Sequence, residues 1–241
     1  MSREEKIART FVHLADSLVD DYDVIDLLQH LTLSCRDLLD ATDVAVLLAY
    51  PGPDLYSPVP CDPSPALAAV LDPAARQGPA VDACRTAAAV APGPLATAPA
   101  AWRDFTEAAR RTGYTHAAAV PVRLRRDTLG SLLLLSTGDG PLPPADLRLA
   151  QAFADATALG LLNARPAGRP HTISEQLHDA LHSRIVIEQA KGFLAERDSL
   201  SADDAFAALR DHARRHGVPL TEVARTVVTT GRLRPPTATG N

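Results

Sequence analysis

The sequence predicts an α+β N-terminal domain, an antiparallel sheet with flanking helices, followed by an all-α C-terminal domain of three helices. Three observations lead to this fold class. Short apolar runs typical of strands occur at residues 44–50, 115–123 and 128–136. A segment with two prolines, residues 164–170, separates these runs from the rest of the chain. From residue 171 onward the spacing of apolar residues is helical.

The N-terminal domain is expected to begin with two helices. Apolar residues recur every three or four positions in the first helix, and a polar break at residues 20–23 precedes the second. The second helix carries one apolar face, made of Leu27, Leu28, Leu31, Cys35, Leu38 and Leu39. Residues 44–50 follow as a nearly continuous apolar run, which predicts a buried strand.

Six prolines at residues 51–65 predict a loop, or at best an edge strand. An irregular stretch and one helix are expected next, before the two strands at 115–123 and 128–136. A helix at 144–163 completes the domain, with Ala150, Thr157 and Leu161 among its inward-facing residues. An antiparallel sheet with helices packed on one side fits this order of elements.

Capping residues delimit the C-terminal helices. The first is expected at about residues 173–196, and the second starts at Ser201, whose spacing to Asp204 resembles a capping box. Gly217 ends the second helix, and the third begins at Pro219. The expected organisation is a first domain at 1–163, a Pro/Gly linker at 164–171, a helical domain at 172–231 and a disordered tail at 232–241.

Composition excludes several classes of protein. The 241 residues are 46% hydrophobic and 22% charged, as in an ordinary globular chain. No apolar run reaches the roughly 18 residues of a membrane span, so no membrane partner is expected, and the charged N-terminus does not resemble a signal peptide. Three cysteines at wide spacing predict neither a disulfide framework nor a zinc ribbon. We therefore expect a cytoplasmic protein.

The formal charge of −5 is unevenly distributed. Residues 171–234 hold nine basic and nine acidic side chains, so the acidic excess lies upstream of them. Residues 205–234 contain six arginines but only two acidic residues, Asp211 and Glu222. A basic helical module joined to an acidic domain is typical of a sensor coupled to a nucleic-acid reader. A solvated face on which charges happen to cluster is the alternative.

The C-terminal residues resemble a known family. The string Ile187-Glu188-Gln189-Ala190-Lys191-Gly192, continued by residues 205–210, 212–216 and 220–224, is similar to ANTAR domains, which are RNA-binding transcription antitermination modules. The resemblance covers about residues 172–231. It implies a dimer that binds paired RNA stem-loops in nascent transcripts and prevents a terminator from forming.

The first domain resembles GAF sensor domains. Residues 77–86 are similar to the family's Gly-Pro-x-x-Asp-x-x-Arg-Thr stretch, and residues 120–122 and 129–132 are similar to its last two strands. Residues 51–65 depart from the family pattern because they show no clear second strand. The resemblance implies control by a small-molecule or protein signal, and Asp82, Cys84 and Arg85 are the candidate ligand-binding residues. Asp82 and Arg85 could instead form a structural pair, and Cys84 could be a redox switch or simply a small apolar residue.

The resemblance to ANTAR domains directs attention to the basic side chains of the helical domain. Arginines grip phosphates and stack on bases, so they suit the splayed loops that RNA readers recognise. Ion pairs within a helix are the competing interpretation, with Asp211 near Arg214 and Arg215 and with Glu188 near Arg184 and Lys191. The candidate RNA contacts are Arg184, Lys191, Arg210, Arg214, Arg215 and Arg225.

No catalytic or cofactor-binding motif is apparent, so we expect neither an enzyme nor a cofactor. His178 and His182 are four residues apart, but the pattern lacks a His-Glu-x-x-His arrangement, and no metal site is expected. A homodimer is expected from a short seam formed by Ile173, Leu177, Ala180 and Leu181. Two alternatives stay open, a DNA-binding transcription regulator and a ligand-binding module whose helical tail only dimerises.

Overall fold

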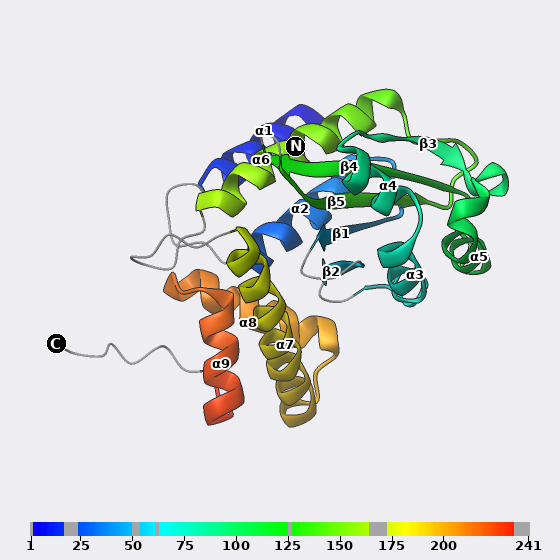
Figure 1. The fold of residues 1–241 in the computed structure, drawn as a ribbon. Helices are drawn as coiled ribbons and strands as arrows, with labels where there is room; N and C mark the ends of the chain where they lie inside the picture. Colours follow the sequence, from blue (N-terminus) through cyan, green and yellow to red (C-terminus); the bar gives the residue numbers. More distant parts are fainter. Residues whose placement is uncertain are drawn as a thin grey trace.

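The computed structural model describes residues 2–16, 24–49, 54–60, 63–124, 127–163 and 173–233. Within these residues the N-terminal domain contains a five-stranded antiparallel sheet in the order β2-β1-β5-β4-β3 (Figure 1). Its strands are β1 (Asp43–Ala49), β2 (Leu55–Val59), β3 (Val90–Pro94), β4 (His116–Leu124) and β5 (Asp127–Ser136). The three strands expected from the apolar runs are β1, β4 and β5, which form the centre of the sheet.

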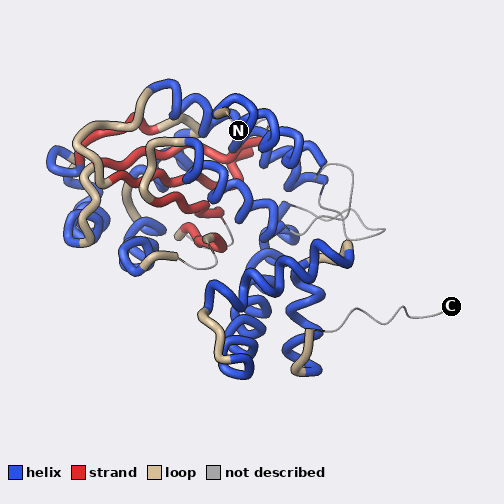
Figure 2. The backbone as a smooth tube through the Cα atoms, turned by 180° about the vertical axis from the view of Figure 1, so that it is seen from behind, coloured by secondary structure: helices blue, strands red, loops and turns tan. Residues whose placement is uncertain are grey.

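Helices cover both faces of this sheet, so the expectation of helices on one side only is wrong (Figure 2). One face packs against α1 (Arg3–Asp16), α2 (Val24–Leu38) and α6 (Pro144–Asn163). The other packs against α3 (Pro65–Arg76), α4 (Pro79–Thr86) and α5 (Arg103–Arg111), with two short 3₁₀ turns, η1 (Leu95–Thr97) and η2 (Ala100–Trp102), before α5.

Strand β1 shows how both faces come to be covered. Val44, Val46 and Leu48 belong to the core beneath α2 and α6, whereas Ala45 and Leu47 belong to the core beneath α3 and α5. Successive side chains of a strand point to opposite faces, so a strand buried on both sides reads as a continuous apolar run. Such a run indicates that the strand is buried, but it does not indicate which helices cover each face of the sheet.

The proline-rich stretch does contain a strand. Residues 55–59 form β2, which pairs with β1 through Val46↔Val59, Leu48↔Tyr56 and Ala49↔Leu55. Because β2 lies at the edge of the sheet, Pro58 within it removes no hydrogen bond that a second neighbour would need. The edge-strand alternative for residues 51–65 is therefore confirmed, and the expectation that they lack a clear second strand is wrong. Strand β3, at the other edge, was not expected at all.

Two glycines are required by close approaches within the domain. Gly78, the N-cap of α4, has φ +114°, and a Cβ there would lie 2.9 Å from the Phe105 ring. At Gly130 in β5, a Cβ would lie 2.2 Å from the carbonyl oxygen of Leu47. Only glycine permits these conformations and contacts without displacing backbone or a buried ring.

The C-terminal residues form three helices, α7 (Ile173–Asp198), α8 (Ala202–His216) and α9 (Leu220–Thr230), as expected. The Ser201 hydroxyl oxygen accepts the Asp204 backbone N–H at 3.1 Å, which confirms the cap of α8. Gly217 (φ +62°) and Gly231 (φ +70°) follow α8 and α9 in the left-handed conformation of helix ends. Pro219 is the N-cap of α9 rather than its first helical residue.

The two halves of the chain share a core. Helix α7 contacts α2 and β2, and buried residues of α7, α8 and α9 belong to the same apolar cluster as those of α1, α2 and α6. The proposed linker (164–171) and all but residues 232–233 of the proposed tail lie outside the described residues. No helix of the described segments has the length and apolar character needed to cross a bilayer.

Candidate nucleic-acid interface

The helices that carry the basic residues, α7, α8 and α9, lie together in Figure 1, and buried apolar side chains pack between them. The principal contacts are those of α7 with α9 and α8, and α8 also packs on α9. Residues on the opposite sides of these helices face outward at helical spacing, and Arg215 and Arg225 are among them. The buried core residues are Ile187, Ala190, Leu194, Ala205, Leu209, Leu220, Val223, Ala224 and Val227.

Three candidate arginines have described side chains, and they differ in exposure. Arg215 and Arg225 are exposed, and Arg210 is half-buried. Arg215 Nε donates to the backbone carbonyl of Asp211 at 3.2 Å, one helical turn earlier. The Nε of Arg210 is buried and has no hydrogen-bond partner among the described residues. Arg215 and Arg225 therefore present guanidinium groups to solvent, where a phosphate could approach them.

Lys191 lies differently from the arginines. Only 9% of its side-chain surface is exposed, and its Nζ lies 2.9 Å from Glu188 Oε2. This is the ion pair that the sequence offered as the alternative to RNA contact. The pair joins successive turns of α7 next to the buried Ala190.

Two of the candidate residues, Arg184 and Arg214, have side chains that lie outside the described part of the structure. Their backbones are helical, in α7 and α8 respectively. The same holds for the expected dimer seam and for the first two histidines: their backbones are helical, and their side chains lie outside the described part of the structure. These residues are Ile173, Leu177, Ala180, Leu181, His178 and His182.

His212 and His216 of α8 are also four residues apart, and His212 is buried. The rings of His212 and His216 stack with centroids 4.1 Å apart, and His216 Nδ1 lies 2.9 Å from the His212 carbonyl oxygen. Among the described residues, no three His, Cys, Asp or Glu side chains come together as metal ligands would. In this pair the four-residue spacing therefore brings two imidazole rings into a stack.

The three ligand-binding candidates of the N-terminal domain lie on α4. Arg85 Nη2 donates to Asp82 Oδ1 at 2.7 Å, and the indole N–H of Trp102 donates to Asp82 Oδ2 at 2.9 Å. Asp82 therefore joins α4 to η2, a link that sequence reasoning missed because the two residues are distant in the chain. Cys84 is half-buried, and this burial raises the pKa of its thiol. A raised pKa leaves little of the reactive thiolate at neutral pH.

A further polar cluster at the start of β1 was also missed. The Tyr114 hydroxyl donates to Asp43 Oδ2 at 2.5 Å, and Ser64, the N-cap of α3, donates to the same carboxylate at 3.3 Å. Burial and then the hydrogen bond to Asp43 raise the pKa of Tyr114. Only an isolated Asp at the beginning of a buried strand signalled this cluster in the sequence.

Comparison with known families accounts for both halves of the chain. The model of the GAF domain matches residues 23–161, more than half of the chain, and the model of the ANTAR domain matches residues 175–228. A comparison with curated proteins gives no significant match. GAF domains are sensor domains and ANTAR domains are those of RNA-binding antitermination regulators, so both are regulatory rather than catalytic. The chain belongs to the GAF family, and with its second domain it is a GAF and ANTAR domain-containing protein.

Proposed function

We propose that this protein is a cytoplasmic regulator that binds stem-loop RNA through α7–α9 and promotes transcription antitermination under the control of its GAF domain. The observation that carries the proposal is the ANTAR match over residues 175–228. That match spans most of α7 and all of α8, and it extends into α9, the helices that carry the candidate arginines.

The charge distribution supports RNA as the partner. Six arginines and two acidic residues lie within residues 205–234, whereas the chain as a whole carries −5. Arginine recognises phosphates with a planar fork of donors and stacks on unpaired bases, both of which a loop of RNA offers. We propose Arg210, Arg214, Arg215 and Arg225 as direct contacts, with Arg184 at the edge of the same surface. Lys191, buried beside Glu188, would contribute mainly by holding α7 in place.

Control by the GAF domain requires a physical connection, and α7 provides one. This helix contacts α2 and β2, and its core is continuous with that of the sensor. A signal that shifts α2 or the edge strand β2 would change the packing beneath α7. Differential binding of the signal to two such arrangements is what would change RNA affinity.

We also propose that the protein acts as a homodimer. Ile185 lies four residues after Leu181 of the proposed seam, on the same side of α7, and it is 54% exposed. Phe193 on α7 and Val228 on α9 are exposed as well. Large apolar side chains left in solvent favour association with a second copy. A monomeric mass by light scattering, with and without RNA, would exclude this arrangement.

The test is a titration of the full chain with a paired stem-loop RNA and with duplex DNA of equal length, each over a series of salt concentrations. We expect loop-dependent RNA binding that exceeds DNA binding at moderate salt. The double variant R215A/R225A should weaken RNA binding and reduce the salt slope by about 0.7–0.9 for each phosphate that is no longer neutralised. Both side chains are exposed, so folding should not change.

The matched control is R148A, which removes an exposed arginine from α6 of the GAF domain. It should bind RNA as the unmodified chain does. Equal binding to RNA and DNA that disappears with salt would indicate only a generic basic surface, and preferential DNA binding would favour the DNA-binding alternative. Either result would overturn the proposed function.

A further inference from the structure

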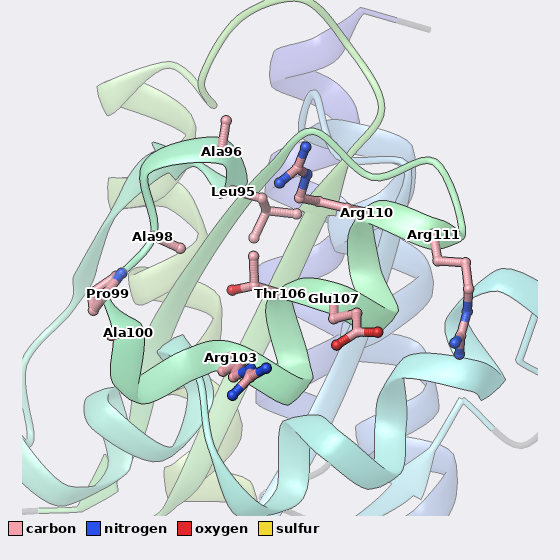
Figure 3. A pocket seen from close by; sticks show the side chains of 10 residues that line it. All are labelled: Leu95, Ala96, Ala98, Pro99, Ala100, Arg103, Thr106, Glu107, Arg110 and Arg111. Carbon is pink, nitrogen blue, oxygen red and sulfur yellow. The ribbon is translucent and has the colours of Figure 1, made fainter.

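A groove on the GAF domain lies between the η1–η2 segment and α5 (Figure 3). Its volume is about 580 Å³, within the range of small-molecule sites. The interior between the sheet and α3–α5 is packed with Leu67, Val70, Phe105 and Leu133, so this groove lies at the edge of that core, with which it shares Leu95. One wall is apolar and is built from Leu95, Ala96, Ala98, Pro99 and Ala100.

Two arginines of α5 mark the ends of the groove. Figure 3 shows the guanidinium groups of Arg103 and Arg110 at opposite ends, with Thr106 between them. Residues seven apart lie on the same helix face, about 10.5 Å apart along the axis. Within the described part of the chain, neither guanidinium forms an ion pair or a side-chain hydrogen bond. Arg85 on α4, by contrast, is paired with Asp82.

Besides Arg103 and Arg110, two further charged side chains line the groove, one negative and one positive. Glu107 and Arg111 also line it, and neither forms an ion pair among the described residues. The lining therefore has three positive groups and one negative group. An anionic ligand would be attracted by this excess, and it would be attracted most strongly to the two arginines at the ends.

Thr106 supplies an unused polar group between the two arginines. Its hydroxyl oxygen is buried and has no partner among the described residues. Other helical threonines donate to the carbonyl one turn earlier, as Thr226 does to Glu222 at 2.9 Å and Thr157 does to Phe153 at 2.8 Å. Four residues before Thr106 is Trp102, whose backbone (φ −103°, ψ 22°) is not helical. A buried hydroxyl without a partner carries a cost that a ligand could remove.

Hydrogen bonds outside the groove hold its two sides in place. Trp102 of η2 is bound to Asp82 of α4, and the backbone N–H of Asp104 donates to Gln77 Oε1 at 3.0 Å. Gln77 Nε2 in turn donates to Asp104 Oδ2 at 2.7 Å. The start of α5 is thus fixed to α3 and α4. A groove fixed in advance loses less entropy on binding.

We propose that this groove binds a small organic dianion whose two charged groups are separated by an apolar spacer. Arg103 and Arg110 each hold one charged group, Thr106 hydrogen-bonds to the ligand between them, and the Leu95–Pro99 side packs against the spacer. Asp82 acts as a positioning residue that holds η2 through Trp102. The inference goes beyond the proposed function because it concerns binding that needs no RNA.

Three probes of equal chain length test the class of ligand: adipate with two carboxylates, hexanoate with one, and the neutral hexanediol. None absorbs where tryptophan does, so the fluorescence of Trp102, the only tryptophan, reports binding next to the groove. Isothermal titration calorimetry on the full chain gives the affinities. We expect saturable adipate binding with Kd of about 1 mM, as suits a ligand of this size. Hexanoate should bind about tenfold more weakly and hexanediol more weakly still.

The double variant R103Q/R110Q should lower adipate affinity about a hundredfold, because each charge-assisted hydrogen bond is worth about tenfold. T106V, which removes only the hydroxyl, should lower it about threefold. R148Q is the matched control and should bind adipate as the unmodified chain does. Near-ultraviolet circular dichroism and melting temperature verify folding; Arg103 and Arg110 are exposed, so neither should change.

Three results would overturn the proposal. They are no saturable adipate signal at about 10 mM, equal affinity for adipate and hexanoate, and unchanged adipate binding by folded R103Q/R110Q. The measurements use no RNA, so their outcome does not depend on whether the proposed function is correct. A chain that binds adipate but no RNA would contradict that function and leave the groove assignment intact.

Discussion

Replacing Gly130 by alanine should separate two central strands of the GAF sheet. An added Cβ would lie 2.2 Å from the Leu47 carbonyl oxygen and 2.8 Å from Leu48 Cα. Both are backbone atoms of β1, which pairs with β5 through Leu47↔Ser131 and Leu48↔Gly130. No side-chain rotation can relieve the overlap, so the strands must move apart by about 1 Å to reach an ordinary contact distance.

The expected loss in unfolding free energy is about 3 kcal/mol. Overpacking costs about 1–3 kcal/mol, and each backbone hydrogen bond weakened by the separation adds about 1 kcal/mol. For a domain of this size, this corresponds to a fall in melting temperature of about 10 °C. Urea unfolding followed by Trp102 fluorescence measures the change in the domain that contains Gly130.

Gly140 provides the matched control. It receives the same substitution in open space, since no atom lies within 4 Å of an added Cβ. G140A should change stability by no more than about 0.5 kcal/mol. If G130A and G140A unfold at the same urea concentration, the close approach of β1 and β5 is not what requires glycine, and the argument from packing is wrong.

Three further predictions concern buried polar groups and helix propensity. S131A should be neutral or stabilising by about 1 kcal/mol in urea unfolding, because the Ser131 hydroxyl is fully buried and has no partner among the described residues. A clear loss of unfolding free energy would contradict this and would mean that the hydroxyl forms a hydrogen bond. Y114F should lose about 2 kcal/mol near pH 7 with the hydrogen bond to Asp43. Because the pKa of Tyr114 is raised in the folded protein, this contribution to stability is complete below the unfolded pKa of about 10 and declines above it. Unfolding measured from pH 8 to 11 should therefore show the free energies of the two proteins converging. A difference that stays constant over this range would contradict the assignment. G192A should stabilise α7 by about 0.5–1 kcal/mol in thermal unfolding followed by circular dichroism, since an added Cβ meets nothing within 4 Å, and a destabilised variant would show that the glycine is needed for packing.

The parts of the fold that could be predicted are those with a strong local signal. Helix α6 begins at Pro144 and ends at Asn163, as expected, because its apolar spacing is regular over five turns. The cap at Ser201 and the glycines after α8 and α9 delimit the C-terminal helices in the same local way. Residues 55–111 were largely misassigned, because β2, α3, α4, β3 and α5 are short and rich in alanine and proline. Such segments are specified by packing more than by propensity.

The candidate sites divide in the same way. The pairs Asp82–Arg85 and Glu188–Lys191 are three residues apart on a helix, so their spacing was enough to suggest them. Trp102 and Asp82 are twenty residues apart, and Tyr114 and Asp43 are seventy-one apart. Whether such residues meet depends on strand order and helix placement, which hydrophobic periodicity does not encode.

The sequence by itself determined the two-domain order, the strands of the sheet centre, the three C-terminal helices and the family of each half. These features rest on local periodicity, capping residues and motif strings, all of which lie within short stretches of chain. Only the tertiary structure decided that helices cover both faces of the sheet, that α7 packs on α2 and β2, and that Lys191 is buried. It also assembled the groove between η1–η2 and α5. These are contacts between elements, and they form only when distant residues are brought together by packing the apolar faces that each element carries.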